Sequence, residues 1–260
     1  GSCDVGKYMT HPAFTSFSSV KGLWVGKFET TGSVSSLNIK PEKKPITNIT
    51  ISNAFKTSYN YKRNLDSHMM KNTEWGAVAY LTHSIYGKCN GTTCEEVYIN
   101  NNSNFLTGWS GTTVDAGSSS SSGYAYSHAN SVKASSTGNY SGIYDLSGGA
   151  WDRVAAVRGS LTSGSAGFTS SDVSNYNKKY YDTYSTSANS SSTYTTRILG
   201  DATAETKGWN GDYAGFVGSS GPWFGRGGYY NSASGAGVFS FIGSIGGTGS
   251  GDSFRVVLAY

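Results

Sequence analysis

Two long stretches rich in Gly, Ser, Asn and Thr interrupt this chain, and they limit the architectures that it can adopt. They cover residues 86–141 and 160–208. Such segments are typical of surface loops, because their small polar side chains bury little apolar area. The core must therefore be built from hydrophobic segments on both sides of the loops. We expect one domain over residues 3–260, with the two stretches as long irregular insertions.

The polar character of the chain comes mainly from uncharged residues. Charged residues make up 14% of the 260 residues, whereas there are 35 Gly and 19 Tyr. This composition predicts a loop-rich globular protein of the extracellular type. The net charge of +4 is spread along the chain, and the densest basic run, 40–44, contains Pro41 and Glu42. That run is typical of a solvated loop, so no nucleic-acid partner is predicted.

Hydrophobic periodicity indicates both strands and a helix. Residues 66–81 carry apolar side chains at helical spacing and predict a core helix, with Thr73 or Ser67 as its N-cap. Residues 142–154 form a compact hydrophobic element with a turn at 147–149. Strands are predicted where apolar and polar residues alternate or β-branched and aromatic residues gather, at 23–29, 237–241 and 253–258.

The three cysteines give a small disulfide framework. Cys89 and Cys94 enclose the four residues Asn-Gly-Thr-Thr, and in an exported protein they predict a local disulfide. The alternative is a metal site, which needs two further ligands that the neighbouring sequence does not supply. Cys3 is free or pairs outside this sequence, and Gly1-Ser2 is interpreted as the scar of a cleaved tag.

Four segments, taken together, resemble one branch of the C-type-lectin fold, that of the formylglycine-generating enzyme or sulfatase-modifying factor. The order and spacing of these segments match over nearly the whole chain. The resemblance implies an α+β fold with a small twisted antiparallel sheet and much irregular backbone. The segments are 22–31, 72–80, 142–151, and Arg226-Gly-Gly together with 254–257.

The C-terminal segments resemble, more narrowly, the variable proteins of diversity-generating retroelements, in particular pilin-like surface proteins of gut Firmicutes. In those systems error-prone copying mutates adenines of a template, and the product is written into the 3′ end of the gene. Asn codons mutated at their adenines never encode Lys, Glu, Gln, Met or Trp, and residues 227–254 contain none of these five. The segments that carry the resemblance are 222–230, 236–241, Gly246 and 253–257.

The resemblance divides residues 223–257 into fixed and variable positions. Phe239, Phe241 and Phe254 are expected to face the core, and Arg226 with its two following glycines to set the backbone geometry. The remaining positions, here called the free positions, are expected to vary and to face solvent or ligand; a flexible loop without a partner is the alternative. The free positions are Gly225, Tyr229, Asn231, Ser232, Ser234, Ser240, Ile242, Gly243, Ser244, Ile245, Gly247, Gly249, Ser250, Gly251 and Asp252.

The function that the resemblance implies is ligand binding without catalysis, as an adhesin or receptor at the cell surface. The ligand would be an unknown protein or glycan on a host, bacterial or environmental surface. A pilin-like hydrophobic helix upstream of this sequence would anchor the domain to a filament or membrane, so this part makes no membrane contact of its own. A phage tail-tip receptor-binding protein is the alternative setting. Among the free positions only Tyr229, Ile242 and Ile245 are sizeable apolar groups, which predicts a shallow, weak site.

An oxygen- or metal-dependent enzyme of the sulfatase-modifying type is the alternative function. The enzymatic relatives use cysteines near the C-terminal strand, whereas residues 95–260 contain none. An iron centre needs clustered histidines, and the spacing H-x-x-x-H is absent from the four histidines, His11, His68, His83 and His128. Asp145 is interpreted as a structural hydrogen-bonding acid beside Trp151. We therefore expect no catalytic residue, no metal and no cofactor; a structural calcium ion has no motif to support it.

Overall fold

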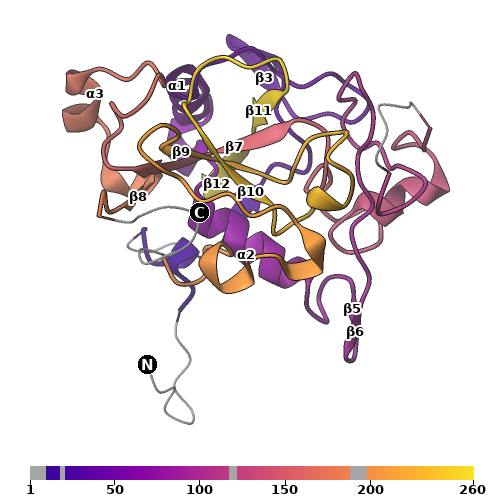
Figure 1. The fold of residues 1–260 in the computed structure, drawn as a ribbon. Coiled ribbons are helices and arrows are strands. Elements are labelled where there is room, and N and C mark those ends of the chain that lie inside the picture. The colour runs from indigo at the N-terminus through magenta and orange to yellow at the C-terminus, as the bar shows by residue number, and fades with distance from the viewer. Residues whose placement is uncertain (1–9, 18–20, 117–121, 188–197) are drawn as a thin grey trace.

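The computed structural model describes residues 10–17, 21–116, 122–187 and 198–260, and it has the mixed α+β architecture that the sequence predicted (Figure 1). Among these residues no helix is both long and apolar enough to cross a bilayer. The expectations for Gly1-Ser2, Cys3 and most of the serine run at 118–122 concern residues outside the described ranges. The helices are α1 (Ile51–Tyr61), α2 (Asn72–Thr82) and α3 (Ser170–Asn175). The strands are β1 (Leu23–Val25), β2 (Thr31–Ser33), β3 (Ser36–Asn38), β4 (His68–Met69), β5 (Cys89–Asn90), β6 (Thr93–Cys94), β7 (Trp151–Arg158), β8 (Asp182–Tyr184), β9 (Trp223–Arg226), β10 (Phe241–Ser244), β11 (Asp252–Phe254) and β12 (Val256–Ala259).

The central sheet has the strand order β10-β9-β7-β11, and β8 also pairs with β7. The pairs β10–β9 and β9–β7 are antiparallel, as expected. However, β11 and β8 pair with β7 in the parallel direction, along the first and second parts of the same edge. The sheet is therefore mixed rather than purely antiparallel, because long connections let these two strands enter in the direction of β7.

Both faces of β7 are buried, and its side chains alternate between two hydrophobic clusters. Val154 and Ala156 lie in the cluster around Trp75 of α2, whereas Ala155 and Val157 lie in the cluster around Phe55 of α1. Figure 1 shows α1 and α2 on opposite sides of the sheet. Because successive side chains of a strand point to opposite faces, one apolar strand supplies both clusters. The central sheet is therefore covered by a hydrophobic cluster on each of its two faces.

The first and last strands meet in a second sheet of order β1-β12-β4. β12 lies between β1 and β4 and pairs antiparallel with both, with Leu23 opposite Ala259. Val256 belongs to the cluster around Phe55 and Val257 to the cluster around Trp75. The last strand therefore joins the first strand to both parts of the core.

Four predicted element boundaries are wrong. The single strand expected over 253–258 is divided at Arg255 into β11 and β12, which belong to different sheets. α2 begins at Asn72 and is capped by Lys71 rather than by Thr73 or Ser67; the Lys71 N–H donates to the Glu74 carboxylate at 2.8 Å. The alternating pattern predicted one strand over 23–29, but β1 ends at Val25. β10 begins only at Phe241, because residues 237–240 form a turn in which the Ser240 N–H donates to the Gly237 carbonyl.

The second polar stretch contributes more to the core than its composition predicted. It contains α3 and β8, and Tyr180, Tyr181 and Tyr184 are buried. The Tyr184 hydroxyl donates to Asp201 at 2.6 Å and accepts from the Asn72 amide at 2.8 Å, so its polar end is satisfied inside the protein. Tyrosine thus supplies apolar area in a segment rich in Ser and Thr.

Candidate ligand-binding surface

A shallow cavity of about 200 Å³ lies beside the exposed face of β10. Its walls come from β7, β10 and two loops, and they include the free positions Ser232 and Ile242. The residues that line it are Trp151, Tyr213, Ser232, Gly235 and Ile242.

The sheet register fixes the floor of this cavity. Ile242 lies opposite Gly225, which in turn lies opposite Arg153 of β7. A Cβ atom at Gly225 would lie 3.3 Å from the Ile242 side chain and 3.5 Å from the Trp151 ring. Because glycine leaves this space empty, the Trp151 indole and the Ile242 side chain approach each other across β9.

Trp151 and Tyr213 are aromatic groups that the sequence did not assign to the ligand surface. The Tyr213 side chain is 52% exposed, while its backbone is fixed by bonds to Gly235 and Phe241. Ala214 forms a parallel bridge with Phe241, which places this segment beside β10. No signal in the sequence indicated this pairing, because the segment around Tyr213 has no strand-like pattern to match that of residues 237–241.

Tyr229 and Tyr230 form an aromatic cluster with Phe105 at a second part of the surface. The ring centroids of Tyr229 and Tyr230 are 4.3 Å apart, and Phe105 lies 5.6 Å from Tyr229 and 5.4 Å from Tyr230. The Tyr229 ring also covers Gly251, where a Cβ atom would overlap it. The free positions 229 and 251 therefore share one space, and a larger residue at 251 requires Tyr229 to move.

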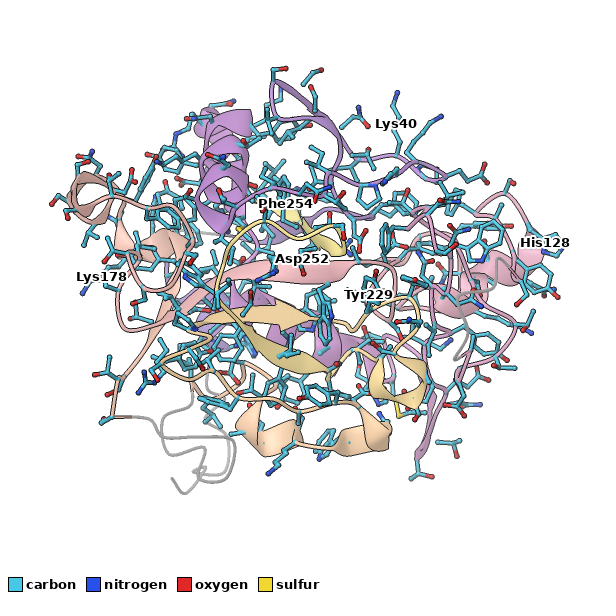
Figure 2. The ribbon with its side chains drawn as sticks, turned by 45° about the horizontal axis from the view of Figure 1, so that its top comes forward. Lys40, His128, Lys178, Tyr229, Asp252 and Phe254 are labelled. Carbon is cyan, nitrogen blue, oxygen red and sulfur yellow. A yellow bond between two sulfur atoms is a disulfide. The ribbon has the colours of Figure 1, made fainter. Side chains whose placement is uncertain are left out.

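Arg153 links two other free positions. Its guanidinium group lies 2.5 Å from an Asp252 carboxylate oxygen and also donates to the Ser244 hydroxyl. The Arg153 and Asp252 side chains are 11% and 16% exposed, so the ion pair is partly shielded from water. Figure 2 shows Asp252 and Tyr229 near each other over the central strands. This pair gives the surface a polar part beside its aromatic part.

Two free positions do not have the exposure expected of them. Gly225 is buried within β9, and Ser240 is fully buried in the turn before β10. The Ser240 hydroxyl has no hydrogen-bond partner among the described residues. The other free positions are half-buried (Tyr229, Ser232, Ile242, Gly243, Ser244, Gly247, Gly249, Gly251 and Asp252) or exposed (Asn231, Ser234, Ile245 and Ser250).

The residues expected to be fixed form the support of this surface. Phe239, Phe241 and Phe254 are buried, as predicted. Arg226 is buried as well, and its guanidinium group donates to the Ala202 carbonyl at 2.9 Å and lies 5.6 Å from the Trp75 ring centre. Gly227 and Gly228 have φ angles of 84° and 89°, and a Cβ atom at Gly228 would lie 2.6 Å from Ala236. Only glycine fits that turn without strain.

The buried acids have structural partners. Asp145 accepts hydrogen bonds from the Asn100 amide and the Gly108 N–H, both at 2.9 Å. Asp152 pairs with Arg255 at 3.0 Å, and burial raises the pKa of Asp152 to about 6. Glu29 lies near both acids, and burial raises its pKa well above the usual value. Because one arginine faces three buried carboxyl groups, the fold favours a protonated Glu29.

The histidines have four separate environments. His68 pairs with Glu74 at 2.8 Å inside the core. His11 lies 2.8 Å from the Gly200 carbonyl, and His128 accepts a hydrogen bond from the Asn130 N–H at the start of a 3₁₀ helix. His83 lies at the end of α2, beside the two cysteines of the β5–β6 hairpin.

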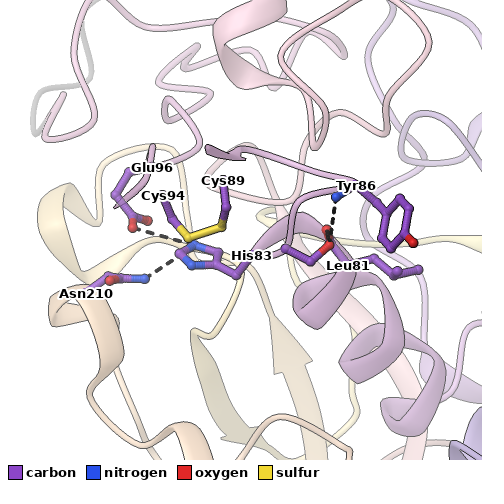
Figure 3. Close-up of a disulfide and its surroundings, with 8 residues drawn as sticks. Leu81, His83, Tyr86, Cys89, Cys94, Glu96 and Asn210 are labelled. Carbon is purple, nitrogen blue, oxygen red and sulfur yellow. Dashed lines mark hydrogen bonds and ion pairs between the residues drawn. A yellow bond between two sulfur atoms is a disulfide. The ribbon is translucent and has the colours of Figure 1, made fainter. Parts of the chain in front are cut away.

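A disulfide joins Cys89 to Cys94 across this hairpin, as the spacing predicted (Figure 3). The expectation that the neighbouring sequence supplies no further metal ligand is wrong. The His83 ring and the two sulfur atoms are within 4.8 Å of one another, and Glu96 lies 3.6 Å from His83. His83 precedes Cys89 by six residues and Glu96 follows Cys94 by two, so the local sequence already contained both groups.

Comparison with known proteins does not add an identity. Protein-family models give no match to the chain, and curated protein sequences give none.

Proposed function

We propose that this chain is a non-catalytic binding domain with a C-type-lectin-like fold, and that its ligand surface is diversified by a retroelement. The observation that supports this most directly is the arrangement of the free positions. Outside Gly225 and Ser240 they are half-buried or exposed; Ser232 and Ile242 line the cavity beside β10, and Tyr229 and Gly251 lie together in the Tyr229 cluster. Their support is a sheet covered on both faces.

A rigid support of this kind suits a surface whose side chains change. When backbone geometry is fixed by buried residues, substitutions on the exposed face alter recognition without unfolding the domain. Arg226 and the turn at Gly227 and Gly228 fix the backbone geometry in this way. All three residues are buried and shielded from solvent. The fixed residues hold the fold, and the free positions meet the ligand.

The cavity favours a ligand that presents one small anchoring group. Its volume of about 200 Å³ is less than that of a typical drug-sized site, ~300–1,000 Å³. Trp151 and Tyr213 offer aromatic surface for a hydrophobic side chain of a protein or for a sugar ring. We propose an adhesin or receptor at a cell surface, anchored through a preceding pilin-like segment, with a protein or glycan as its ligand.

Sequencing the same gene from sibling isolates tests the diversification. Substitutions should gather at the exposed and half-buried free positions and coincide with adenines of a template repeat near a reverse-transcriptase gene. Positions such as Phe241 and Arg226 serve as internal controls and should not change. An even spread of substitutions along the chain would overturn the proposal.

Binding itself is tested with arrays of surface glycoproteins and purified glycans, probed with the labelled domain. On any array member that binds, Tyr213→Ala should lower affinity by ~5–150-fold, the equivalent of ~1–3 kcal/mol for an aromatic anchor. Tyr86→Ala removes a tyrosine that is 77% exposed on the α2 side and serves as the matched control. If Tyr213→Ala, Tyr86→Ala and the unchanged domain bind with equal affinity, the ligand contacts another part of the surface and not this cavity. Binding to the protein array or to the glycan array identifies the ligand class.

A further inference from the structure

The β5–β6 hairpin holds its two cysteines together by more than the disulfide. The Cα atoms of Cys89 and Cys94 are 3.9 Å apart as a cross-strand pair. Backbone hydrogen bonds fix both strands from outside: the Glu95 N–H donates to the Lys88 carbonyl at 2.9 Å, and the Cys89 N–H donates to Ser84 at 3.1 Å. The two sulfur atoms therefore remain neighbours when the bond between them is opened.

His83 is held in position beside these sulfur atoms. Its N–H donates to the Ala79 carbonyl at 3.1 Å, which fixes the residue at the end of α2. Its ring packs against the buried Phe239 with 4.9 Å between centroids, and the His83 side chain is 11% exposed. Figure 3 shows the ring next to the disulfide, between Glu96 and Asn210. The imidazole is thus ordered by the core rather than by the cysteines.

Glu96 adds a carboxylate on the side of the imidazole that faces solvent. Its oxygen lies 3.6 Å from His83 Nε2, and its side chain is 31% exposed. A cavity of about 200 Å³ opens beside it and is also lined by Asp115, Asn210 and Asp212. The acids of this cavity attract cations and give an ion a route to Glu96.

We propose that reduction of the Cys89–Cys94 disulfide converts this hairpin into a zinc site. Its ligands are the two thiolates, the His83 imidazole and the Glu96 carboxylate. Two sulfur donors, one nitrogen and one oxygen form a ligand set that suits tetrahedral zinc, which binds cysteine, histidine and carboxylate side chains. None of the four ligands is a free position, so the proposal does not depend on the proposed function, although the free position Ser234 lines the same cavity as Glu96.

The two states exclude each other chemically. A thiol reductant supplies two electrons and becomes a disulfide itself, while the bond between the two cysteine sulfurs breaks and each takes up a proton. Zinc then displaces both protons to solvent as the thiolates coordinate it. A disulfide oxidant accepts two electrons from the two thiolates and, with two protons from solvent, becomes two thiols; the Cys89–Cys94 bond re-forms and the ion is released.

Zinc titration of the oxidised and the phosphine-reduced protein against a chromophoric chelator tests the proposal. A Cys3→Ser background removes the third thiol. The reduced protein should bind one zinc per chain and the oxidised protein none. With cobalt in place of zinc, the reduced protein should show thiolate-to-cobalt charge-transfer absorption and the intense visible bands of a tetrahedral ion.

Ligand variants separate the built site from two free thiols. His83→Phe keeps a ring against Phe239 but removes the nitrogen, and it should weaken zinc binding by at least ~10-fold, as should Glu96→Gln. Glu95→Gln changes the neighbouring exposed acid and should leave the affinity unaltered. Absence of stoichiometric zinc in the reduced protein, or equal affinity in His83→Phe, Glu96→Gln and the background, would overturn the proposal. Circular dichroism of each variant shows that it is folded.

Discussion

At the scale of single residues, burial separates positions that the sequence pattern grouped together. Ser240 and Ser244 lie in one segment, yet Ser240 is fully buried and Ser244 is half-buried at the end of β10. The Ser240 hydroxyl lacks a hydrogen-bond partner among the described residues, so it adds no stabilising contact there. Its small volume is what the turn before β10 requires.

Ser240→Asn should lower the free energy of unfolding by ~1–3 kcal/mol, because a larger group enters a filled core. Ser240→Ala should leave stability unchanged or slightly raised, since it removes an unpaired buried hydroxyl. Urea unfolding measures both. Ser234→Asn changes an exposed free position and should alter stability by less than ~0.5 kcal/mol. A Ser240→Asn protein as stable as Ser234→Asn would show that position 240 tolerates variation.

For charged residues, too, the surroundings decide whether the side chain is buried in the core. Arg255 is fully buried, and its guanidinium group donates to Asp152 at 3.0 Å and to the Gly26 carbonyl at 2.7 Å. Arg255 and Asp152 partner each other inside the core, so loss of one member would leave the other unpaired in a buried position. This explains why an arginine interrupts the apolar run between β11 and β12.

At the scale of elements, a single carboxylate ties the turn before β10 to the 3₁₀ helix at Trp209–Gly211. Asp212, which directly follows that helix, accepts a hydrogen bond from the Phe239 N–H at 2.9 Å. Burial raises the pKa of Asp212 to about 7; the bond from Phe239 opposes this shift, and the nearby Glu96 adds to it. The turn before β10 and the loop at Asp212 are therefore joined through a carboxyl group whose pKa is raised to about 7.

Asp212 should make the folded protein less stable as the pH rises from about 4 to about 7. In that window the unfolded chain has lost the Asp212 proton, while the folded protein, with its raised pKa, still holds it. The folded state binds more protons, so the free energy of unfolding falls with increasing pH. Between pH 5 and 7, the free energy of unfolding of the unchanged protein should fall by ~1–3 kcal/mol more than that of Asp212→Asn, because residue 212 of the variant has no proton to release.

Urea unfolding at several pH values measures this difference. Asp115→Asn removes an exposed acid of the same cavity and is the matched control; its pH profile should follow that of the unchanged protein. Parallel profiles for Asp212→Asn and the unchanged protein would contradict the prediction. The other buried acids with raised pKa act in the same direction in all three proteins, so the comparison isolates Asp212; they are Glu29, Asp145, Asp152, Asp182 and Asp201.

At the scale of the whole molecule, two strands join regions that are far apart in the sequence. β7 supplies side chains to both hydrophobic clusters, and β12 pairs with β1 and β4 while contributing to the same two clusters. If either cluster unfolds, the other loses the side chains that β7 and β12 contribute to it. The arrangement favours a single cooperative unit.

Phe55→Ala opens a cavity in the α1 cluster and should destabilise the protein by ~3–5 kcal/mol. Because the clusters share β7 and β12, the protection of backbone amides against hydrogen exchange should fall by the same amount in α1, β7 and α2. Native-state hydrogen exchange measures this. Leu81→Ala, at a side chain that is 54% exposed, should leave protection unaltered. A loss confined to α1 would show that the clusters unfold separately.

Much of the framework could be predicted from local sequence. The apolar spacing of α2, the burial of Phe239, Phe241 and Phe254, and the glycines at 227 and 228 all follow from periodicity and backbone sterics. The disulfide follows from the short spacing of its cysteines. Each of these properties depends on residues that are close in the chain, so a local pattern is sufficient to indicate it.

The contacts that join distant segments were decided by the tertiary structure. The chain alone could not reveal that Tyr213 and Trp151 line the cavity with Ile242, or that Ser240 is buried. These features depend on strand register and on the parallel entry of β8 and β11 beside β7. By itself the sequence determined which residues could be buried and where the backbone had to turn. Packing decided which residues meet, because the contact energies that select a register are summed over segments far apart in the chain.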